Sequence, residues 1–163
     1  YQRAVEINPD LAVFQNELAR LLIRVGKEAD AIKHYQAALK LDPSLESSRG
    51  NLANALARRG KFSEAIRIYR SMIKNNPFNA QVYYNLGVAL ELSGKRKEAR
   101  RRLEAACRLR PDYAAAHLKL AEILEKEGQL EEAKNHRKQA AELDLGFDEA
   151  LTKPEENLQR LQQ

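Results

Sequence analysis

The sequence predicts an all-α fold, a solenoid of helix–turn–helix hairpins stacked in a row. Three observations predict it. Four of the 7 glycines and four of the 5 prolines recur at one fixed step along the chain. Amphipathic runs of helical length fill the intervals between them. The composition, 44% hydrophobic and 31% charged, excludes a disordered tail.

Four residue types keep a common step of 34 residues. The prolines are Pro9, Pro43, Pro77 and Pro111. The glycines are Gly26, Gly60, Gly94 and Gly128. The alanines are Ala31, Ala65, Ala99 and Ala133. The leucines are Leu18, Leu52, Leu86 and Leu120. Independent ladders with a single period are the signature of a repeat array, so we expect one hairpin per period.

Each ladder has a mechanical reason. Within one period, the runs Gln81–Ser93 and Arg96–Leu109 are long enough for two helices. The glycine between them supplies the positive φ at which many helices end. The proline after the second run ends that helix, because it has no N–H to continue the hydrogen-bond ladder. Side-chain oxygens that are expected to cap the next helix belong to Asp10, Ser44, Asn79 and Asp112.

Small and large residues alternate in a way that predicts tight packing. Small residues recur on the first helix of each hairpin, at Ala19, Ala53, Gly87 and Ala121. We expect them to face the alanine ladder of the second helix and to let the two helix axes approach closely. Larger side chains are expected to fill the space between hairpins, at Tyr1, Tyr35, Tyr69 and Leu103. Stability must then come from stacked neighbours, because no hairpin covers its own apolar face.

These motifs resemble the tetratricopeptide repeat, a helix–turn–helix of 34 residues. Tyr83-Tyr84-Asn85-Leu86-Gly87, followed by Gly94, Ala99 and Pro111, carries the resemblance most clearly. The resemblance implies a right-handed superhelix, an α-solenoid that binds other proteins. The expected divisions are 1–10, the end of a preceding repeat, then repeats at 12–45, 46–79, 80–113 and 114–145, and a capping helix at 146–163.

Both ends depart from the pattern. Arg137 replaces the tyrosine of earlier repeats, Leu145 stands where a fifth proline belongs, and Pro154 would interrupt a fifth hairpin. These changes predict the C-terminal cap. The chain opens at Tyr1 without an initiator methionine, in the middle of an expected helix. We therefore expect the sequence to be an excerpt from a longer polypeptide.

A concave groove is the expected partner site, because the resemblance implies that the first helices line it. The predicted partner-binding residues are Asn16, Arg20, Asn51, Asn54, Tyr84, Asn85, Val88, Lys119 and Glu122. Asn51 and Asn85 are equivalent positions, and a carboxamide can both donate to and accept from a peptide backbone. The alternative is that these asparagines are ordinary surface residues.

Some family members clamp the carboxylate tail of heat-shock chaperones with two asparagines and three basic residues. Asn54, Asn85 and Lys119 match three of those positions, whereas Gly50 and Ala115 stand where the family places lysines. A carboxylate would lose most of its charge-assisted hydrogen bonds without those lysines. The sequence therefore argues against a chaperone-tail receptor.

Positive charge is concentrated in the middle of the chain. Residues 46–79 hold seven basic and two acidic residues, and residues 80–113 hold eight and four. A basic convex patch is predicted at Lys95, Arg96, Lys97, Arg101 and Arg108. The simplest interpretation is a solvated face in which Glu98 and Glu104 pair with nearby arginines. An acidic protein surface ranks next as its partner, and anionic lipid or nucleic acid ranks last, because no aromatic residues are interleaved.

Candidates for catalysis and metal binding fail in turn. Cys107 is the only cysteine and lies on an apolar helix stripe, so it is expected to be a buried small hydrophobe. His34, His117 and His136 are expected on different faces or in distant repeats, without metal-ligand spacing. No glycine-rich phosphate loop is present. We expect no enzyme activity, no cofactor, no metal and no small-molecule substrate.

The leading hypothesis is a protein-interaction scaffold or adaptor that binds an extended or helical segment of its partner. The alternative is the substrate-recruiting arm of a larger enzyme, such as a protein O-glycosyltransferase. A nucleic-acid-binding solenoid and self-association through the first helix are further alternatives. The longest uncharged stretch, Asn75–Leu90, contains Pro77 and is not expected to span a membrane. The single cysteine fits a reducing compartment, so a cytoplasmic location is expected.

Overall fold

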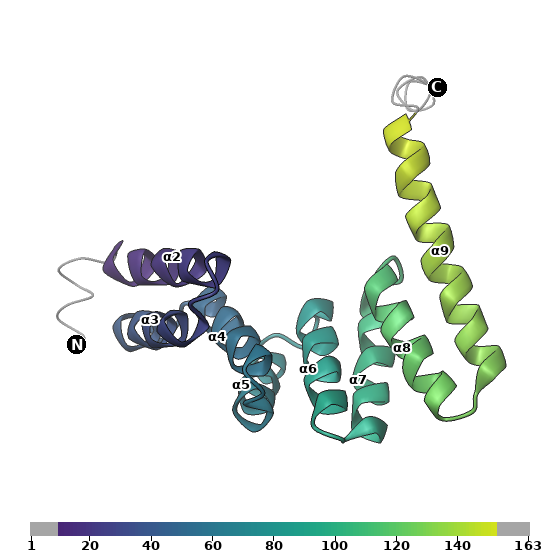
Figure 1. The fold of residues 1–163 in the computed structure, drawn as a ribbon, viewed down its shortest axis with the longest axis horizontal. Helices are drawn as coiled ribbons and strands as arrows, with labels where there is room; N and C mark the ends of the chain where they lie inside the picture. Colours follow the sequence, from purple (N-terminus) through teal and green to yellow (C-terminus); the bar gives the residue numbers. More distant parts are fainter. Residues whose placement is uncertain (1–9, 153–163) are drawn as a thin grey trace.

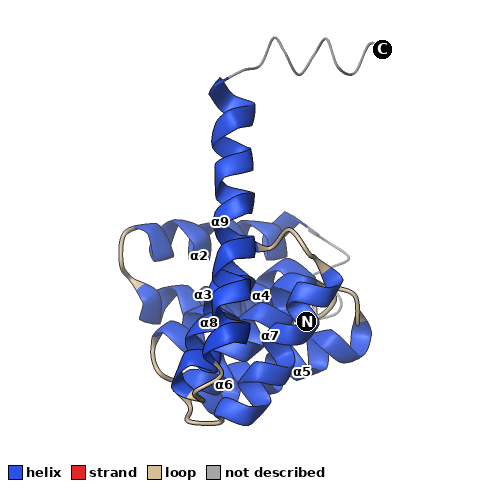
Figure 2. Ribbon diagram, turned by 90° about the vertical axis from the view of Figure 1, so that its right-hand side faces the viewer, coloured by secondary structure: helices blue, strands red, loops and turns tan. Residues whose placement is uncertain are grey.

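The structure, a computed structural model, describes the backbone of residues 10–152 and the side chains of residues 11–143. This backbone is helical apart from its turns, as Figure 2 shows. The helices are α2 (Asp10–Arg24), α3 (Glu28–Leu41), α4 (Glu46–Arg58), α5 (Phe62–Asn75), α6 (Ala80–Leu92), α7 (Arg96–Leu109), α8 (Ala114–Lys126) and α9 (Leu130–Thr152).

Consecutive helices form hairpins that follow one another in a row (Figure 1). The first helices of the hairpins are α2, α4, α6 and α8, and the second helices are α3, α5, α7 and α9. The second helices α3, α5 and α7 also pack against the first helix of the next hairpin. In addition, α4 contacts both α2 and α6, whereas the second helices are spread further apart. The array therefore has an inner side formed by first helices and an outer side formed by second helices.

A glycine ends the first helix of every described hairpin, as predicted. Gly26, Gly60, Gly94 and Gly128 have φ angles between 74° and 80°. After Gly94, the N–H of Lys95 donates to the carbonyl of Leu90 at 2.9 Å, and the N–H of Gly94 donates to the carbonyl of Glu91 at 2.9 Å. This pair of bonds is the Schellman arrangement, which requires the positive φ. The same pair recurs in the other three hairpins.

Of the four predicted caps, the side chain of Asp10 lies outside the described residues, and only Asn79 of the other three caps a helix. The side chain of Asn79 accepts a hydrogen bond from the N–H of Val82 at 3.3 Å and caps α6. Ser44 and Asp112 do not cap, because each follows its proline directly, whereas the N-cap residue lies two positions after the proline in all three turns, at Leu45, Asn79 and Tyr113. The carboxylate of Asp42 instead accepts from the N–H of Ser44 at 2.8 Å and stabilises the turn.

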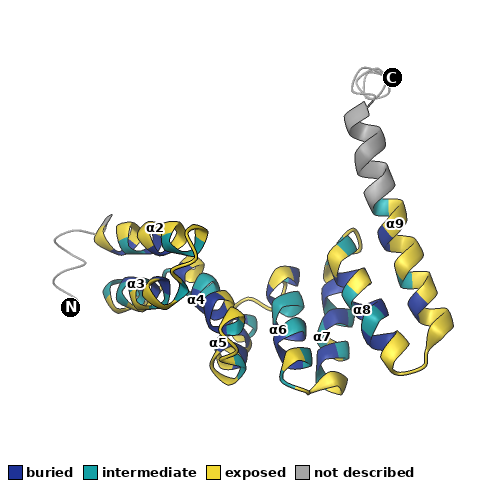
Figure 3. Cartoon of the chain, in the orientation of Figure 1, coloured by how far each residue is buried: buried dark blue, intermediate teal, exposed yellow. Residues whose placement is uncertain are grey.

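The predicted spacers and small residues form the core. Tyr35, Tyr69 and Leu103 are buried, and Figure 3 shows buried residues along the sides on which the helices meet. Gly87 confirms the prediction of close approach, because a Cβ atom added there would lie 2.7 Å from Cγ of Leu103. Only a residue without a side chain fits between α6 and α7 at this point.

One face of α2 is both apolar and exposed. It carries Leu11, Phe14, Leu18, Leu21 and Val25. Leu18 is 43% exposed, whereas the residues at the equivalent positions of α4, α6 and α8 are buried. Those residues are Leu52, Leu86 and Leu120. Internal hairpins therefore cover this face with the preceding hairpin, and residues 1–10, which were predicted to end a preceding repeat, are outside the described side chains.

The last helix is longer than predicted. We expected the fourth repeat to end at 145 and a separate capping helix to follow at 146–163, but α9 is continuous from Leu130 to Thr152. Position 145 is leucine, whose backbone N–H lets the helix continue where a proline would end it. The remainder of the predicted cap, 153–163, is outside the described residues. None of the described helices is long and apolar enough to cross a membrane.

Candidate functional site

The inner side of the array holds a hollow of about 460 Å³ between α4 and α6. The groove, as we call it, is lined by Asn54, Ala57, Arg58, Tyr69, Gln81, Tyr84, Asn85, Val88, Ala89 and Leu92. Four of the residues predicted to bind a partner are among them, namely Asn54, Tyr84, Asn85 and Val88. They meet because α4 contributes the residues of one repeat and α6 those of the next.

A chain of hydrogen bonds runs along one wall of the groove. The hydroxyl of Tyr69 and the Nδ2 of Asn85 both donate to Oδ1 of Asn54, at 2.6 Å and 3.0 Å. The Nε2 of Gln81 donates to Oδ1 of Asn85 at 3.0 Å, and the hydroxyl of Tyr113 donates to Oε1 of Gln81 at 2.7 Å. Burial raises the pKa of Tyr69, so its hydroxyl keeps the proton that it donates. The wall is therefore ordered before any partner arrives.

The hydrogen-bond chain also determines which donors and acceptors of this wall remain free for a partner. The Oδ1 of Asn54 already accepts two hydrogen bonds, and that of Asn85 accepts one. The Nδ2 of Asn54 makes no hydrogen bond to the described residues, and an amide nitrogen carries two donors. Among the amide side chains of the wall, free donors thus outnumber free acceptors, which suits the carbonyl oxygens of a bound peptide backbone.

The rest of the groove is largely apolar. The rings of Tyr84 and Tyr113 lie 5.1 Å apart, and the guanidinium of Arg110 lies 3.5 Å from the centre of the Tyr113 ring. Val88 is half-buried, and Leu92 is 60% exposed at the groove edge. Exposed apolar surface beside ordered polar groups is the usual composition of a protein-binding patch.

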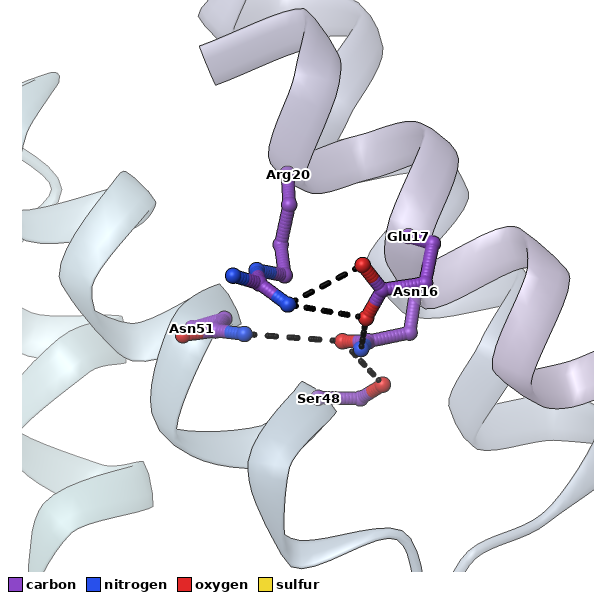
Figure 4. A network of polar contacts seen from close by, with 5 residues as sticks. All are labelled: Asn16, Glu17, Arg20, Ser48 and Asn51. Atoms are coloured by element: carbon purple, nitrogen blue, oxygen red, sulfur yellow. Dashed lines mark hydrogen bonds and ion pairs between the residues drawn. The ribbon is translucent and has the colours of Figure 1, made fainter. Parts of the chain in front are cut away.

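The predicted residues of α2 and the start of α4 form a separate cluster, shown in Figure 4. Arg20 and Glu17 pair at 3.0 Å on the surface and line a second hollow of about 330 Å³ together with Asn51. Asn16 was expected on the groove surface, but it is only 5% exposed. Its Oδ1 accepts from the hydroxyl of Ser48 at 2.8 Å and from Nδ2 of Asn51 at 3.5 Å. Asn16 therefore joins two hairpins and is not part of the accessible groove.

The two predicted residues of α8 are engaged in ion pairs. Lys119 contacts Glu122 at 2.6 Å and Glu91 at 3.6 Å, and Lys126 contacts Glu91 at 2.6 Å. Desolvation raises the pKa of Glu91, but the hydrogen bond from Lys126 and the charges of both lysines outweigh it and lower that pKa overall. This cluster ties α8 to α6, so Lys119 and Glu122 are less available to a partner than the groove residues.

All members of the predicted basic patch are exposed, namely Lys95, Arg96, Lys97, Arg101 and Arg108. Glu104 pairs with Arg100 at 2.7 Å within α7, as the simplest interpretation expected. Glu98 pairs instead with Arg70 of α5, at 2.7 Å. Neither carboxylate pairs with a member of the patch, so its positive charge remains on the surface.

Two histidines lie together, contrary to the prediction that the three histidines lie on different faces or in distant repeats. The Nδ1 atoms of His117 and His136 are 2.9 Å apart, because α8 and α9 bring residues 19 positions apart face to face. The Nε2 of His117 lies 3.0 Å from the carbonyl oxygen of Pro111 and donates to it, so Nδ1 of His117 accepts from His136. Within the described residues, no three His, Cys, Asp or Glu side chains are placed to hold a metal ion.

Cys107 is buried, as predicted. Desolvation raises the pKa of its thiol to about 11, so the thiol is protonated at neutral pH. A protonated, buried thiol is a poor nucleophile. Its environment is that of a packing residue.

Sequence comparisons agree with this repeated architecture. Residues 90–150 match the family described as tetratricopeptide repeat. This part of the chain carries tetratricopeptide repeats. Residues 2–76 match the family described as bacterial transcriptional activator domain. Comparison with curated proteins gave no match.

Solved structures share the fold of this tetratricopeptide array over most of its length. The crystal structure of MamA is 21% identical, covers 91% of this chain and 87% of its own, and has a TM-score of 0.79. MamA from Desulfovibrio magneticus RS-1 is 19% identical, with 82% and 76% covered and a TM-score of 0.76. MamA AMB-1 is 28% identical, with 81% and 78% covered and a TM-score of 0.71.

The predicted partner-binding residues lacked six of the ten groove residues, among them Gln81, Arg58 and Leu92. Gln81 precedes Asn85 by one helical turn, and Arg58 and Leu92 are equivalent positions one repeat apart. All three lie one turn beyond the predicted residues on the same helix face. Extending the inner face of the tetratricopeptide array by one turn in each direction would have found them.

Proposed function

We propose that this tetratricopeptide array is a protein-interaction scaffold and that the groove between α4 and α6 binds a segment of a partner protein. The observation that supports the proposal is the composition of the groove. Apolar side chains that are half-buried or exposed lie beside polar groups whose hydrogen bonds are already formed. Ordering the wall in advance lowers the entropic cost of binding.

The groove chemistry favours a particular kind of segment. Tyr84, Val88 and Leu92 would receive an apolar side chain of the partner, while Nδ2 of Asn54 would donate to a backbone carbonyl. Arg58 is exposed at the groove edge and contacts Glu28 at 3.0 Å, so its charge is partly neutralised. The segment therefore needs an apolar anchor and an accessible backbone more than it needs a particular charge.

A peptide selection tests this proposal directly. A library of short random peptides would be selected on the wild-type array, and the enriched peptides would be measured against a Val88→Arg variant by fluorescence anisotropy. Val88→Arg places a charge where the anchor would bind, and we expect at least a tenfold loss of affinity, which corresponds to about 1.4 kcal/mol.

The matched control is Lys138→Arg, on an exposed part of α9 far along the chain from the groove. It should bind the selected peptides as the wild type does, and circular dichroism should show both variants folded. Selected peptides that bind Val88→Arg as tightly as the wild type would contradict the groove as the binding site.

The match of residues 2–76 to a bacterial transcriptional activator domain favours a second, narrower candidate. In that case the array is the partner-binding part of a transcriptional regulator. Tethering the array to a sequence-specific DNA-binding domain upstream of a reporter gene tests it in bacteria. Transcription should rise with the wild-type array and not with Val88→Arg. An unchanged reporter with the wild-type array would reject this candidate and leave the scaffold itself in place.

A further inference from the structure

The outer side of the array carries two rows of cations that the groove does not use. One row consists of Lys33, Arg67 and Arg101. The other consists of Lys40, Lys74 and Arg108. Members of a row are 34 residues apart, so α3, α5 and α7 each contribute one residue to each row. All six side chains belong to exposed residues, and we call them the cation rows.

The rows face away from the core. On α5, Arg67 and Lys74 are two helical turns apart, about 10.5 Å along the axis. They lie on the helix face opposite to the buried residues Ala65, Tyr69 and Met72. The same register on α3 and α7 gives the same direction, so the rows cross the outer surface of three neighbouring hairpins.

Most of this charge is not neutralised by the protein itself. Lys33 pairs with Asp30 at 3.2 Å. The other five members make no ion pair with the described residues. The carboxylates nearest in sequence to Arg101, namely Glu98 and Glu104, pair with other arginines. Residues 46–113 hold 15 basic and 6 acidic residues, so repulsion among these cations destabilises the folded state.

The rows also have a defined end. At the equivalent positions of α9 stand Asn135 and Glu142, of which the second pairs with Lys138. The cation rows therefore cover α3, α5 and α7 and stop at the fourth hairpin. A surface with a boundary is more easily explained by a partner of matching extent than by a general excess of charge.

We propose that the cation rows bind an acidic segment of a protein partner, with carboxylates spaced about 10 Å apart along α5 and α7. Three of the six residues are arginines, whose planar guanidinium matches a carboxylate through two hydrogen bonds. Single-stranded nucleic acid fits less well, because it is held by exposed aromatic rings. The aromatic rings of α3 and α5 are those of Tyr35, Phe62 and Tyr69, which are buried or half-buried, and α7 has none.

Fluorescence anisotropy with labelled probes tests the proposal. The probes are a peptide of glutamates, a glutamine peptide of the same length, and a DNA duplex of the same total charge. The row variant is Arg67→Gln, Arg101→Gln and Arg108→Gln combined. The control variant is Lys27→Gln, Lys134→Gln and Lys138→Gln, which removes the same charge from exposed residues outside the rows.

We expect the wild type to bind the glutamate peptide and not the glutamine peptide, and to bind more weakly as salt increases. The row variant should bind the glutamate peptide about tenfold more weakly, since each exposed ion pair contributes modestly. The control variant should bind as the wild type does.

Three results would overturn the proposal. An equal loss in both variants would show that net charge, and not the rows, attracts the peptide. Tighter binding of the DNA duplex than of the glutamate peptide would assign the rows to nucleic acid. Absence of binding of the glutamate peptide at low salt would contradict the cation rows as a binding site. The groove variant Val88→Arg should not affect this binding, so the two proposals fail separately.

Discussion

At the scale of single residues, Gly87 sets how closely α6 and α7 approach. A Cβ atom at this position would lie 2.7 Å from Cγ of Leu103, a side chain that is fully buried. We expect Gly87→Ala to lower the free energy of unfolding by about 1–3 kcal/mol, the usual cost of overpacking. Urea denaturation followed by circular dichroism measures this change.

Gly50→Ala is the matched control for that substitution. A Cβ atom at Gly50 would lie 3.4 Å from Cε of Met72, the end of a flexible side chain. Alanine also favours the helix over glycine by about 1 kcal/mol. Gly50→Ala should therefore leave stability unchanged or raise it. Equal destabilisation by both substitutions would show that the contact with Leu103 is not what excludes a side chain at position 87.

The histidine pair makes stability depend on pH. Desolvation, with a smaller contribution from the charge of His117, lowers the pKa of His136 below its ordinary value of 6.5, while Glu132, Glu104 and Gln139 act in the opposite direction. The unfolded chain then binds a proton at a higher pH than the folded chain does. The stability contributed by the neutral His136 is present above pH 6.5 and is lost as the pH falls through the lower, folded value.

We expect His136→Gln to reduce this dependence. The free energy of unfolding would be measured for both proteins between about pH 7.5 and pH 5. The wild type should lose more stability over that interval than the variant, because glutamine does not titrate. An identical loss in both proteins would assign the pH dependence to groups other than the histidine pair.

The residues that the sequence predicted correctly are those on which the fold depends at every repeat. The glycine, alanine and leucine ladders and the spacers Tyr69 and Leu103 each do one mechanical task, so periodicity reveals them. The histidine pair and Asn16 were not predictable in this way. Their environments depend on the residue across the hairpin or in the next repeat, namely His136 and Ser48.

A second spacing in the structure would have found the histidine pair. Gln15 and His34 are also 19 residues apart, and Oε1 of Gln15 lies 2.6 Å from Nδ1 of His34. Residues 19 apart therefore face each other across the hairpin in both cases. Combining this spacing with the 34-residue period predicts which polar residues of a hairpin meet.

At the scale of helices, Glu91 is the main electrostatic tie between α6 and α8. Its carboxylate contacts Lys126 at 2.6 Å and Lys119 at 3.6 Å, and its side chain is only 10% exposed. We expect Glu91→Gln to lower the free energy of unfolding by about 1 kcal/mol, because two lysines lose a charged acceptor. Denaturation at neutral pH and low salt measures the effect.

Comparing the wild type with Glu91→Gln also shows how the contribution of Glu91 to stability changes with pH. Because the pKa of Glu91 is lowered in the folded chain, its contribution is present above its ordinary value of 4.5 and is lost as the pH falls below that value. Lys33→Gln, which breaks the exposed pair with Asp30, is the control and should change little. A loss for Lys33→Gln as large as that for Glu91→Gln would contradict the special role of Glu91.

Helix boundaries were predicted less well than helix positions. Glycine and proline end helices by backbone geometry, which a sequence displays directly. The beginning of a helix depends on how many residues the preceding turn uses, and Ser44 and Asp112 stand one position before the N-cap residues Leu45 and Tyr113. The end of α9 depends on the absence of a stop signal at position 145, and an absent signal does not fix where a helix ends.

At the scale of the whole molecule, stability is expected to decline from the middle of the array toward its ends. The hairpin of α6 and α7 packs against neighbours on both sides, whereas α2 exposes its apolar face and α9 extends beyond α8 (Figure 1). Repeat arrays gain stability mainly from interfaces between neighbours. We therefore expect backbone amides of α6 and α7 to exchange with deuterium most slowly, and those of α2 and α9 fastest. Uniform protection along the chain would indicate one cooperative unit.

Identical hairpin ends have a consequence for engineering. The four glycine turns have nearly the same φ, and the same two backbone bonds follow each of them. A copy of residues 80–113 inserted after Tyr113 would meet the same kind of surface on either side that the original meets. The array can then be lengthened by whole repeats. Each added repeat would bring another Arg101 and Arg108 to the outer side and another Tyr84 and Asn85 to the inner side. Valency toward the two proposed classes of partner would rise in step with length.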